Sequence, residues 1–482
     1  MMFLSFAKIV SAIVAIVGTT YILPISVAFA YGENNVIPHF AIPMFVSWLV
    51  LAFFMLIGRK SKIQLSIRSS FVVVAVAWLT ATVFGTIPLY FSGAITNLAD
   101  AFFESASGFS TTGATIITDI EALPRSINLW RCQTHWIGGM GIVMLTVALL
   151  PVLGVGGFQL IKAETTGPEK GKFTPKITTT AKVLWFMYIG MTTVETVLLK
   201  VAGMDFVDAL SHSFATLGTG GFSTRNASIG SFNSAAIDTI CTVFMYLAGI
   251  NFTLYYYLLT KRFSLIKKNS ELKAYTGIIV IAMILITLFE LSHYGSFAKS
   301  FRYASFQTVS IITSTGFATA DYTTWSSASQ AIILMLFLIG GCSGSTSGGI
   351  KVIRWVVLSK QFHNEIRRIL HPHGIFTIRI NQEPGRKDVV FSVAAFFCIY
   401  VILLVATTLF ACIFGLDLFS SFTGAMSMLG NIGPAFNQLG PSNNYAFLAT
   451  PIKWWYCFMM FAGRLEFYTI IIFFSPSFWK KY

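Results

Sequence analysis

The sequence predicts an all-α polytopic membrane protein, with two N-terminal helices followed by four similar units around one axis. Three observations predict this fold: an apolar composition, ten apolar runs of membrane-spanning length, and a pattern that recurs four times. Of 482 residues, 55% are hydrophobic and 11% are charged, less than half the charged fraction of about 25% in soluble domains. This composition excludes coiled coils, collagen and disordered chains, which need more charge or a strict repeat.

A helix needs about 20 mostly apolar residues to cross a membrane, and ten runs qualify. They lie at about 9–31, 38–58, 70–92, 127–155, 182–202, 235–260, 275–293, 328–358, 389–414 and 453–474. The first run follows Lys8 and ends in Ala28-Phe29-Ala30, as in a secretory signal. Because it is longer than the roughly 7–15 residues of a signal peptide's apolar region, we expect a retained transmembrane helix.

Four shorter apolar segments lie between these runs, and each is too short to cross a membrane. They are Leu98–Phe109, Phe206–Leu217, Phe297–Thr313 and Leu416–Leu429. A glycine-containing turn follows each one, and the turns are Ser110–Thr115, Gly218–Thr224, Thr313–Thr319 and Gly430–Ala435. Internal repetition indicates architecture. We therefore predict two N-terminal helices in 1–64 and four units, in 65–160, 161–262, 263–360 and 361–482.

The basic residues predict an orientation. Most of the 33 Lys and Arg residues lie on the side of the spans opposite the glycine turns, near both termini and in the loops around 59–68, 162–182, 261–273 and 351–387. By the positive-inside rule this side is cytoplasmic, so both termini are cytoplasmic and the turns open outward. The same rule accounts for the net charge of +14 without a nucleic-acid partner.

The four turns favour a cation pathway. Irregular backbone at membrane depth is tolerated only where it is buried in protein or lines water, and a ring of backbone carbonyls can replace the hydration shell of an alkali cation. Glycine adopts the backbone angles that this requires, and the negative end of each half-helix points toward the turn. Thr and Ser hydroxyls add neutral donors. Without a ring of carboxylates, calcium and magnesium are disfavoured.

A second explanation of the turns is that Gly and Thr are common close-packing residues of membrane helices. Four turns in register, each after a half-helix, favour the pore. The fold then becomes four pseudo-fourfold helix–pore loop–helix units around one central pore. The predicted cation-binding selectivity filter consists of Thr111, Thr112, Gly113, Thr219, Gly220, Gly221, Ser314, Thr315, Gly316, Asn431, Ile432 and Gly433.

Several motifs resemble one known family. They are Phe103–Gly108 with Thr111–Thr115, Trp136–Gly141, Leu150–Gly157, Gly220–Thr224, Gly340–Thr346 and Gly463–Glu466. Over essentially its whole length the chain resembles the TrkH/TrkG potassium-uptake subunits of the Trk/Ktr/HKT superfamily. It departs from their pattern at Thr315, Gly430 and Ala435, which bears on conductance and selectivity.

The resemblance implies potassium (K⁺) as the transported ion, no cofactor in this chain, and a multi-pass protein of the bacterial cytoplasmic (inner) membrane. It also implies a homodimer with one pore per subunit, in a lipid bilayer, and a cytoplasmic nucleotide-binding regulatory subunit similar to TrkA.

A glycine-rich stretch, Gly340–Gly349, interrupts the 328–358 run. A phosphate-binding nest is one interpretation, but no Gly-Lys-Ser/Thr follows it. A polar segment halfway down an inner helix is better placed to obstruct a pore, and in the family the matching stretch is an intramembrane gating loop. The predicted gating residues are Gly340, Gly341, Cys342, Ser343, Gly344, Ser345, Thr346, Ser347, Gly348, Gly349, Lys351 and Arg464.

Arg464 lies deep in the last apolar run, where a charged side chain usually faces protein or water. Two roles remain open for it. One is a structural ion pair with Glu466 or another buried acid. The other is a positive charge below the filter that limits ion occupancy or holds the loop. Glu104, Glu195 and Glu290 also lie within or at the ends of apolar segments.

Three classes of function are compatible with a chain of this composition. A channel-like potassium-uptake pore is favoured, because four parallel repeats with outward turns differ from the inverted repeats of many coupled transporters. The alternative is an ion-coupled secondary symporter that moves K⁺ with H⁺ or Na⁺. An enzyme is disfavoured, since no nucleophile elbow or zinc motif is present. The six cysteines lack CxxC spacing and indicate neither a zinc site nor a disulfide framework.

Overall fold

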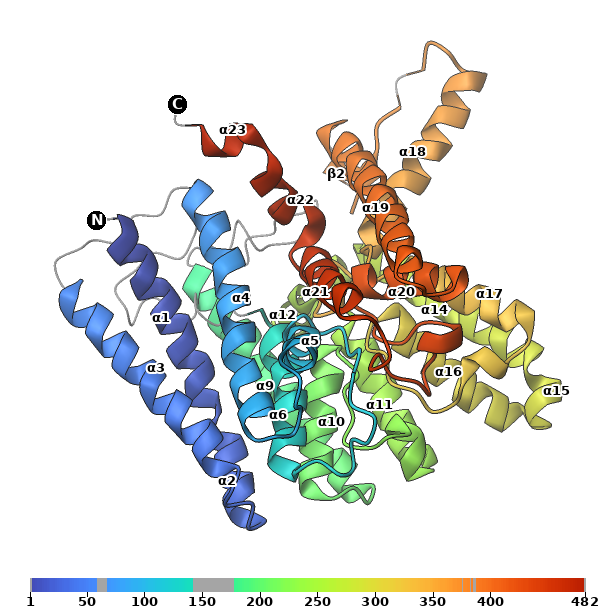
Figure 1. The fold of residues 1–482 in the computed structure, drawn as a ribbon. Coiled ribbons are helices and arrows are strands. Elements are labelled where there is room, and N and C mark those ends of the chain that lie inside the picture. Colours follow the sequence, from blue (N-terminus) through green and yellow to red (C-terminus); the bar gives the residue numbers. More distant parts are fainter. Residues whose placement is uncertain are drawn as a thin grey trace.

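The structure is a computed structural model that describes residues 2–58, 67–141, 177–374, 376–381, 383–384 and 387–480. Helices make up nearly all of its regular structure (Figure 1). The one exception among the described residues is a small antiparallel pair, β1 (Arg379–Ile380) with β2 (Glu383–Pro384). The prediction of an all-α fold is therefore confirmed apart from this hairpin, which pairs only two residues from each strand.

The N-terminal part forms a helical pair. Helices α1 (Met2–Thr20) and α2 (Ile22–Ala30) together make one apolar span, and α3 (Ile37–Ile57) returns beside it. At the end where α3 stops, the buried Lys8 amine donates to the carbonyl of Gly58. A cation at a helix C-terminus is favourable because the helix dipole is negative there. The predicted retained first helix thus packs as part of the protein.

The rest of the chain repeats one pattern four times: a long helix, a short helix, a turn and a second helix. The first two repeats contain α4 (Ile67–Phe91), α5 (Leu98–Phe109) and α6 (Arg125–Gly139), then α9 (Ile177–Val201), α10 (Phe206–Gly218), η1 (Ser228–Phe232), α11 (Ala235–Ala248) and α12 (Phe252–Leu259). The third contains α14 (Ser270–Phe289), α15 (Leu291–Tyr294), α16 (Phe297–Ile312), η2 (Tyr322–Thr324), α17 (Ser327–Leu336) and α18 (Val352–Leu370). The fourth contains α19 (Lys387–Ile413), α20 (Leu418–Gly430), η3 (Asn437–Leu439), α21 (Thr450–Arg464), α22 (Glu466–Ile471) and η4 (Ile472–Phe474). We call these repeats units 1 to 4.

Two short helices complete the described elements. Helix α13 (Phe263–Lys268) joins units 2 and 3, and α23 (Pro476–Trp479) ends the described chain. Both termini lie at the same end of the molecule, the end from which α18 projects (Figure 1). This arrangement agrees with an even number of membrane crossings between them.

Local capping explains where three of the short helices begin. Asn97, Asp205 and Asp417 have extended backbones, and their side-chain oxygens accept from the backbone N–H groups of the first turns of α5, α10 and α20. Such N-caps satisfy amides that have no partner within the helix. Each of these three short helices is therefore started by a polar residue at its outer end and stops at a glycine turn.

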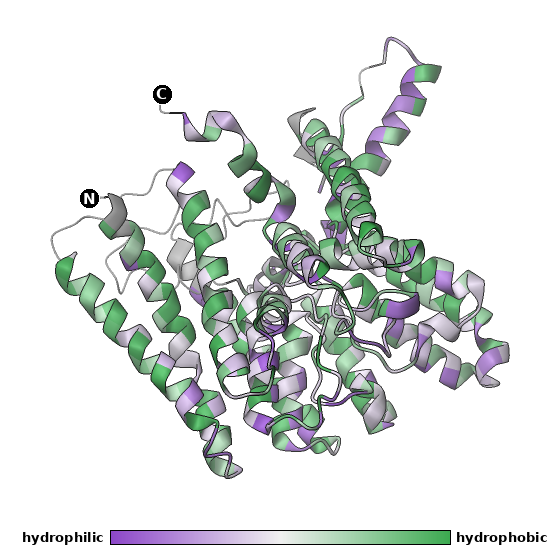
Figure 2. Ribbon diagram, viewed as in Figure 1, coloured by the Kyte–Doolittle hydropathy of each residue, from purple (hydrophilic) through white to green (hydrophobic). Residues whose placement is uncertain are grey.

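Long helices carry exposed apolar faces. On α3, Ile42, Leu49 and Leu56 are 63–73% exposed, and green hydrophobic residues run along the long helices in Figure 2. An apolar surface of this extent belongs in lipid rather than in water. Within the described residues, six helices are long and apolar enough to cross a membrane, or eight when each of two bent pairs counts as one span.

The second helices of units 2 and 4 bend where single spans were predicted, whereas the interruption of the 328–358 run between α17 and α18 agrees with the prediction. The run 235–260 bends by 92° between α11 and α12, and 453–474 bends by 112° between α21 and α22. At the first bend the side chain of Asn251 accepts from Thr253 N and restarts the helix; at the second, Glu466 has a positive φ of 54°.

Some predicted features lie outside the described residues. They are the remainder of the 127–155 run, the motif Leu150–Gly157, most of the 162–182 loop, and most of the 59–68 loop.

Candidate functional site: four glycine turns and an internal loop

The four glycine turns share one backbone conformation. In each, a residue in the left-handed region is followed by a middle residue and then by a glycine with positive φ. The φ values of the first and third residues are 56° and 80° for Thr111 and Gly113, 52° and 77° for Thr219 and Gly221, 53° and 81° for Ser314 and Gly316, and 51° and 97° for Asn431 and Gly433. The predicted triplets thus coincide with the repeated geometry.

The turns close into one ring. A Cβ added to Gly113 would collide with the carbonyl oxygen of Gly220, the middle residue of the second turn. The same relation holds from Gly221 to Thr315 O, from Gly316 to Ile432 O, and from Gly433 back to Thr112 O. Each glycine therefore lies against a carbonyl of the next turn, and the fourth turn meets the first. A side chain at any of the four positions would push backbone apart, and positive φ disfavours it further.

Several of the hydroxyls beside the ring are bonded within the protein. The hydroxyl of Thr112 lies 2.7 Å from Ser110 Oγ, and that of Thr315 lies 2.7 Å from Thr313 Oγ1. Thr219 donates to its neighbour's carbonyl. The hydroxyl of Thr111, by contrast, is buried without a hydrogen-bond partner among the described residues. The backbone carbonyls are the oxygens that all four turns share.

The surroundings of the ring suit a cation. Helices α5, α10, α16 and α20 all end at the turns, so four negative helix ends converge there. On one side, a hollow of about 130 Å³ is lined by Gly113, Gly221, Gly316 and Gly433 and by residues that follow them. Backbone oxygen, negative helix ends and an open mouth together favour entry of a cation stripped of part of its water.

The glycine-rich loop packs directly against the ring from below. It runs from the end of α17 to the start of α18, and Gly348 N donates to the hydroxyl of Ser314 in the third turn (2.6 Å). A Cβ on Gly348 would meet Gly430 O and the Asn431 side chain of the fourth turn. The loop therefore touches the turns of units 3 and 4.

Further bonds tie the loop to units 2 and 3. Cys342 N donates to Gly249 O (2.9 Å), and Phe252 N donates to Gly344 O (3.0 Å), so the loop fills the break between α11 and α12. Ser343 N and Ile353 N both donate to Glu271 Oε1, at 2.7 and 3.1 Å. The bend in unit 2 thus supplies the backbone partners that the loop needs at membrane depth.

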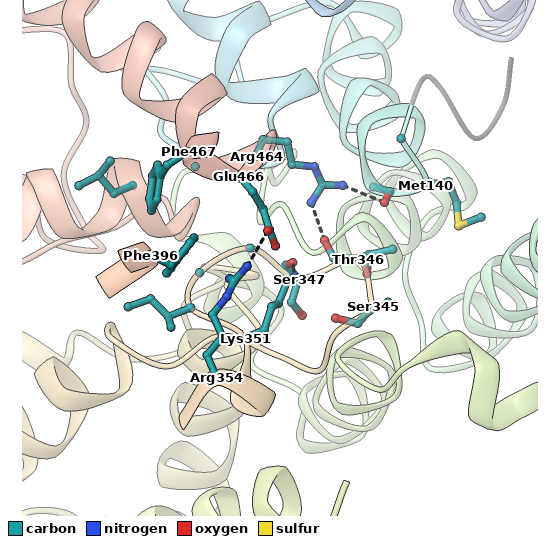
Figure 3. A pocket seen from close by; sticks show the side chains of 18 of the residues that line it. Met140, Ser345, Thr346, Ser347, Lys351, Arg354, Phe396, Arg464, Glu466 and Phe467 are labelled. Atoms are coloured by element: carbon teal, nitrogen blue, oxygen red, sulfur yellow. Dashed lines mark hydrogen bonds and ion pairs between the residues drawn. The ribbon is translucent and has the colours of Figure 1, made fainter. Parts of the chain in front are cut away.

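Arg464 and Lys351 hold the middle of the loop. Arg464 donates to Thr346 O at 2.7 Å, and to Gly138 O and Gly139 O at the end of α6 at 2.6 and 2.8 Å. The buried Lys351 amine donates to Ser347 O. Figure 3 shows these side chains around a cavity of about 150 Å³. The structure therefore brings the predicted residues Gly340–Gly349, Lys351 and Arg464 together.

Glu466 has a different partner from the one considered in the sequence. Its carboxylate pairs with Arg354 Nη2 at 2.5 Å, and the Arg354 guanidinium stacks on Phe396 with its Cζ 3.7 Å from the ring centre (Figure 3). Arg354 begins the helix after the loop, whereas Glu466 lies at the bend after Arg464. This ion pair closes the far end of the loop against unit 4.

Sequence reasoning missed three contributors to the site: Glu271, Arg354 and the side chain of Asn431. Asn431 donates to Thr112 Oγ1 (3.0 Å) and to Met460 O (2.9 Å), which joins the fourth turn to the first. An acid at the start of an apolar run was the one available signal for Glu271. The partners of Arg354 and Asn431 are 112 and 319 residues away, a separation that sequence periodicity does not reveal.

No metal or disulfide cluster complements these features in the described part of the chain. All six cysteines are free thiols, and no group of three or more His, Cys, Asp or Glu side chains is arranged to hold a metal ion among those residues.

Comparison with known proteins identifies the family. The family model TrkH, described as a cation transport protein, matches residues 37–481. The chain belongs to the TrkH family. It is 36% identical to the Trk system potassium uptake protein TrkH of Escherichia coli K12 over 100% of both chains, and 39% identical to TrkH of Halomonas elongata over 88% of both.

A solved structure and a further relative extend the comparison. The crystal structure of the potassium transporter TrkH from Vibrio parahaemolyticus matches 100% of both chains with a TM-score of 0.87 and 35% identity. TrkG of Escherichia coli K12 is 34% identical over 95% of both chains. The match to the solved structure confirms the expected fold. Because the family model is described as a cation transport protein, the glycine ring belongs to a membrane transport protein.

Proposed function

We propose that this chain is a channel-like subunit for potassium uptake, in which the four turns form the selectivity filter. The observation that carries the proposal is the closed ring, in which each turn's glycine lies against the next turn's middle carbonyl. Such a ring replaces the hydration shell of K⁺ with backbone oxygens. Related proteins named for potassium uptake support the choice of ion. K⁺ is cargo here, and the chain needs no resident cofactor for this role.

The loop Gly340–Gly349 acts as the gate, held by Lys351 and Arg464. Its support is position: it lies directly beneath the ring, bonds to Ser314, and is held by Arg464 through Thr346 O. The ring cannot close without losing its carbonyl geometry, whereas glycine backbone can adopt a second arrangement at low cost. A regulated pore of this kind therefore closes below its filter.

A coupled symporter remains the alternative. The common direction of the four units argues for the channel-like pore, because all four short helices end at the same ring. Inverted repeats, typical of many coupled transporters, would point half of them the other way.

The setting is a bacterial cytoplasmic membrane with both termini inside. The basic loops and the shared end of the two termini support this orientation. We further propose a homodimer and a cytoplasmic, nucleotide-binding regulatory subunit similar to TrkA, which the Trk-system names of the relatives support. Association through basic loops weakens with salt, so a partner that copurifies at low salt should dissociate at high salt.

Reversal potentials of the purified protein in liposomes test the filter. Under opposed K⁺ and Na⁺ gradients, Gly113→Ser should lower the K⁺/Na⁺ permeability ratio, since its side chain meets the Gly220 carbonyl. Gly277→Ser is the matched control, because a Cβ at Gly277 meets no atom within 4 Å. An unchanged ratio in Gly113→Ser removes this glycine from the filter. A potential set by a pH gradient alone would favour the symporter.

A further inference from the structure

A fully buried ion pair lies behind the first turn. Arg131 of α6 and Glu104 of α5 have side chains that are 1% and 0% exposed. Arg131 Nη2 and Nε lie 2.7 and 2.8 Å from Glu104 Oε1. Removing one partner of a buried pair leaves an uncompensated charge at high cost, whereas apolar residues of similar volume could replace both partners without that cost. A charged pair at this position therefore calls for an explanation other than stability.

The carboxylate of the pair fixes the backbone that follows Gly113. Glu104 accepts from Thr115 Oγ1 at 2.9 and 3.1 Å and from Ile116 N at 3.0 Å. These residues come two and three positions after the glycine of the first turn. The pair therefore fixes the position of the segment that follows the first turn.

The guanidinium of the pair reaches the second turn. Arg131 Nη1 donates to Ser223 O at 3.3 Å, and Arg131 Cζ lies 4.4 Å from the centre of the Phe222 ring. Ser223 comes two residues after Gly221, the position that Thr115 has in the first turn. One ion pair thus joins units 1 and 2, and it contacts each of them two residues after the ring glycine.

The other units place neutral groups at the same position. Nine residues before each ring glycine stand Glu104, His212, Gln307 and Gly424. His212 Nε2 lies 2.8 Å from Ser223 Oγ, and Gln307 Nε2 donates to Ala320 O at 2.9 Å. In unit 4, which has glycine there, Tyr445 donates to Gly433 O instead (2.6 Å). In every unit, a side chain therefore holds the ring glycine or the segment that follows it. Unit 1 uses a charged pair for this.

We propose that Glu104 and Arg131 are positioning residues for ion discrimination: they hold the carbonyls of turns 1 and 2 at the spacing that favours K⁺ over Na⁺. This inference rests on the proposed filter. The pair is neutral as a whole, so it adds no net charge to the pathway. Two N–H groups of Arg131 converge on one carboxylate oxygen. Such charge-assisted bonds are short and directional, and rigidity of a carbonyl ring limits its collapse onto the smaller Na⁺.

The test uses the full-length protein in liposomes, with the K⁺/Na⁺ permeability ratio as the readout. Arg131→Lys keeps the charge but removes the forked geometry, and Glu104→Gln removes the carboxylate's charge. Each should lower the ratio by about tenfold, equivalent to about 1.4 kcal/mol of discrimination. Thr115→Val deletes one hydroxyl that contacts both partners and should lower the ratio about threefold, or about 0.6 kcal/mol.

A matched control is available at another ion pair. Arg302 and Asp238 join α16 to α11 at 2.7 Å, away from the turns. Arg302→Lys should reduce thermal stability and leave the permeability ratio unchanged. If Arg131→Lys and Glu104→Gln fail to yield monodisperse protein, the milder Thr115→Val decides the question.

Two outcomes separate this inference from the proposed function. If Gly113→Ser shifts the ratio while a folded Arg131→Lys or Thr115→Val protein stays as selective as the parent, the pair is merely structural and the inference is overturned. If Gly113→Ser also leaves the ratio unchanged, the filter assignment itself fails.

Discussion

Removal of the Arg464 side chain should open the pathway without changing its ion preference. Arg464 joins the loop, through Thr346 O, to the end of α6, through Gly138 O and Gly139 O. In Arg464→Ala the loop loses a charged donor, whereas the four turns keep their own contacts. We therefore expect more basal flux at the same K⁺/Na⁺ ratio.

The size of the effect follows from one hydrogen bond. Among these three bonds, only the one to Thr346 O joins Arg464 to the loop, so it is the bond that loop displacement breaks. A hydrogen bond to a charged group contributes about 1.5–3 kcal/mol. Its loss shifts the balance between closed and open arrangements about 10- to 150-fold toward the open one. The bonds to Gly138 and Gly139 connect α21 to α6 and are lost equally in both arrangements.

Rubidium tracer uptake into K⁺-loaded liposomes, without a regulatory partner, measures this flux. Arg464→Lys should give an intermediate value, because an ammonium can replace part of the donor set. Arg125→Ala, which removes an exposed ion pair with Asp205 on the outer side, serves as the control and should leave flux unchanged. A deletion that shortens the loop should also raise flux. Lower flux in both Arg464→Ala and the deletion would refute the gate and leave the loop a structural role.

Three further predictions concern other parts of the molecule. Glu271→Gln weakens two bonds, one to Ser343 in the loop and one to Ile353 at the start of α18, by about 1 kcal/mol in total, and should raise basal tracer flux about fivefold. Gly316→Ala places a Cβ against the Ile432 carbonyl at a φ of 81°, so the single-channel K⁺ conductance should fall about tenfold or more; a normal conductance would show that the ring can relax there. A hydrogen bond from Asn226 lowers the pKa of Asp119 in an outer loop, so its contribution to stability is present above the ordinary pKa and lost as the pH falls through the lowered one. Between about pH 5 and 3, the Tm of Asn226→Ala should therefore decrease less than that of the parent, and an equal decrease would contradict this.

Much of the fold follows from sequence because its signals are local. Run length and hydropathy indicate the long helices, and the four glycine turns reveal the repeat. The triplets from Thr111–Gly113 to Asn431–Gly433 coincide with one recurring geometry. Glycine marks the third position because a Cβ there would meet the next turn's carbonyl and positive φ disfavours it further. Their role as a filter stays a prediction that the permeability measurements test.

The bends and the loop's partners could not be predicted in the same way. A hydropathy average over 235–260 or 453–474 does not detect a turn made by one residue, such as Asn251 or Glu466. The partner of Glu466 is an arginine 112 residues earlier in the chain. Proximity in sequence suggested Arg464, but backbone carbonyls of the loop and of α6 receive that guanidinium instead.

The contacts beneath and behind the ring differ between two of its four junctions. At the junction of units 1 and 2, the Glu104–Arg131 pair bonds to the segments that follow the first and second turns. At the junction of units 3 and 4, the loop touches the turns from below, through Ser314 and beside Gly430. A ring made from one chain can assign these tasks to different units, whereas four identical subunits would carry four copies of each. If the loop gates the pore as proposed, we expect its movement to act first on the third and fourth turns, which it contacts, and to leave the first two held by the ion pair.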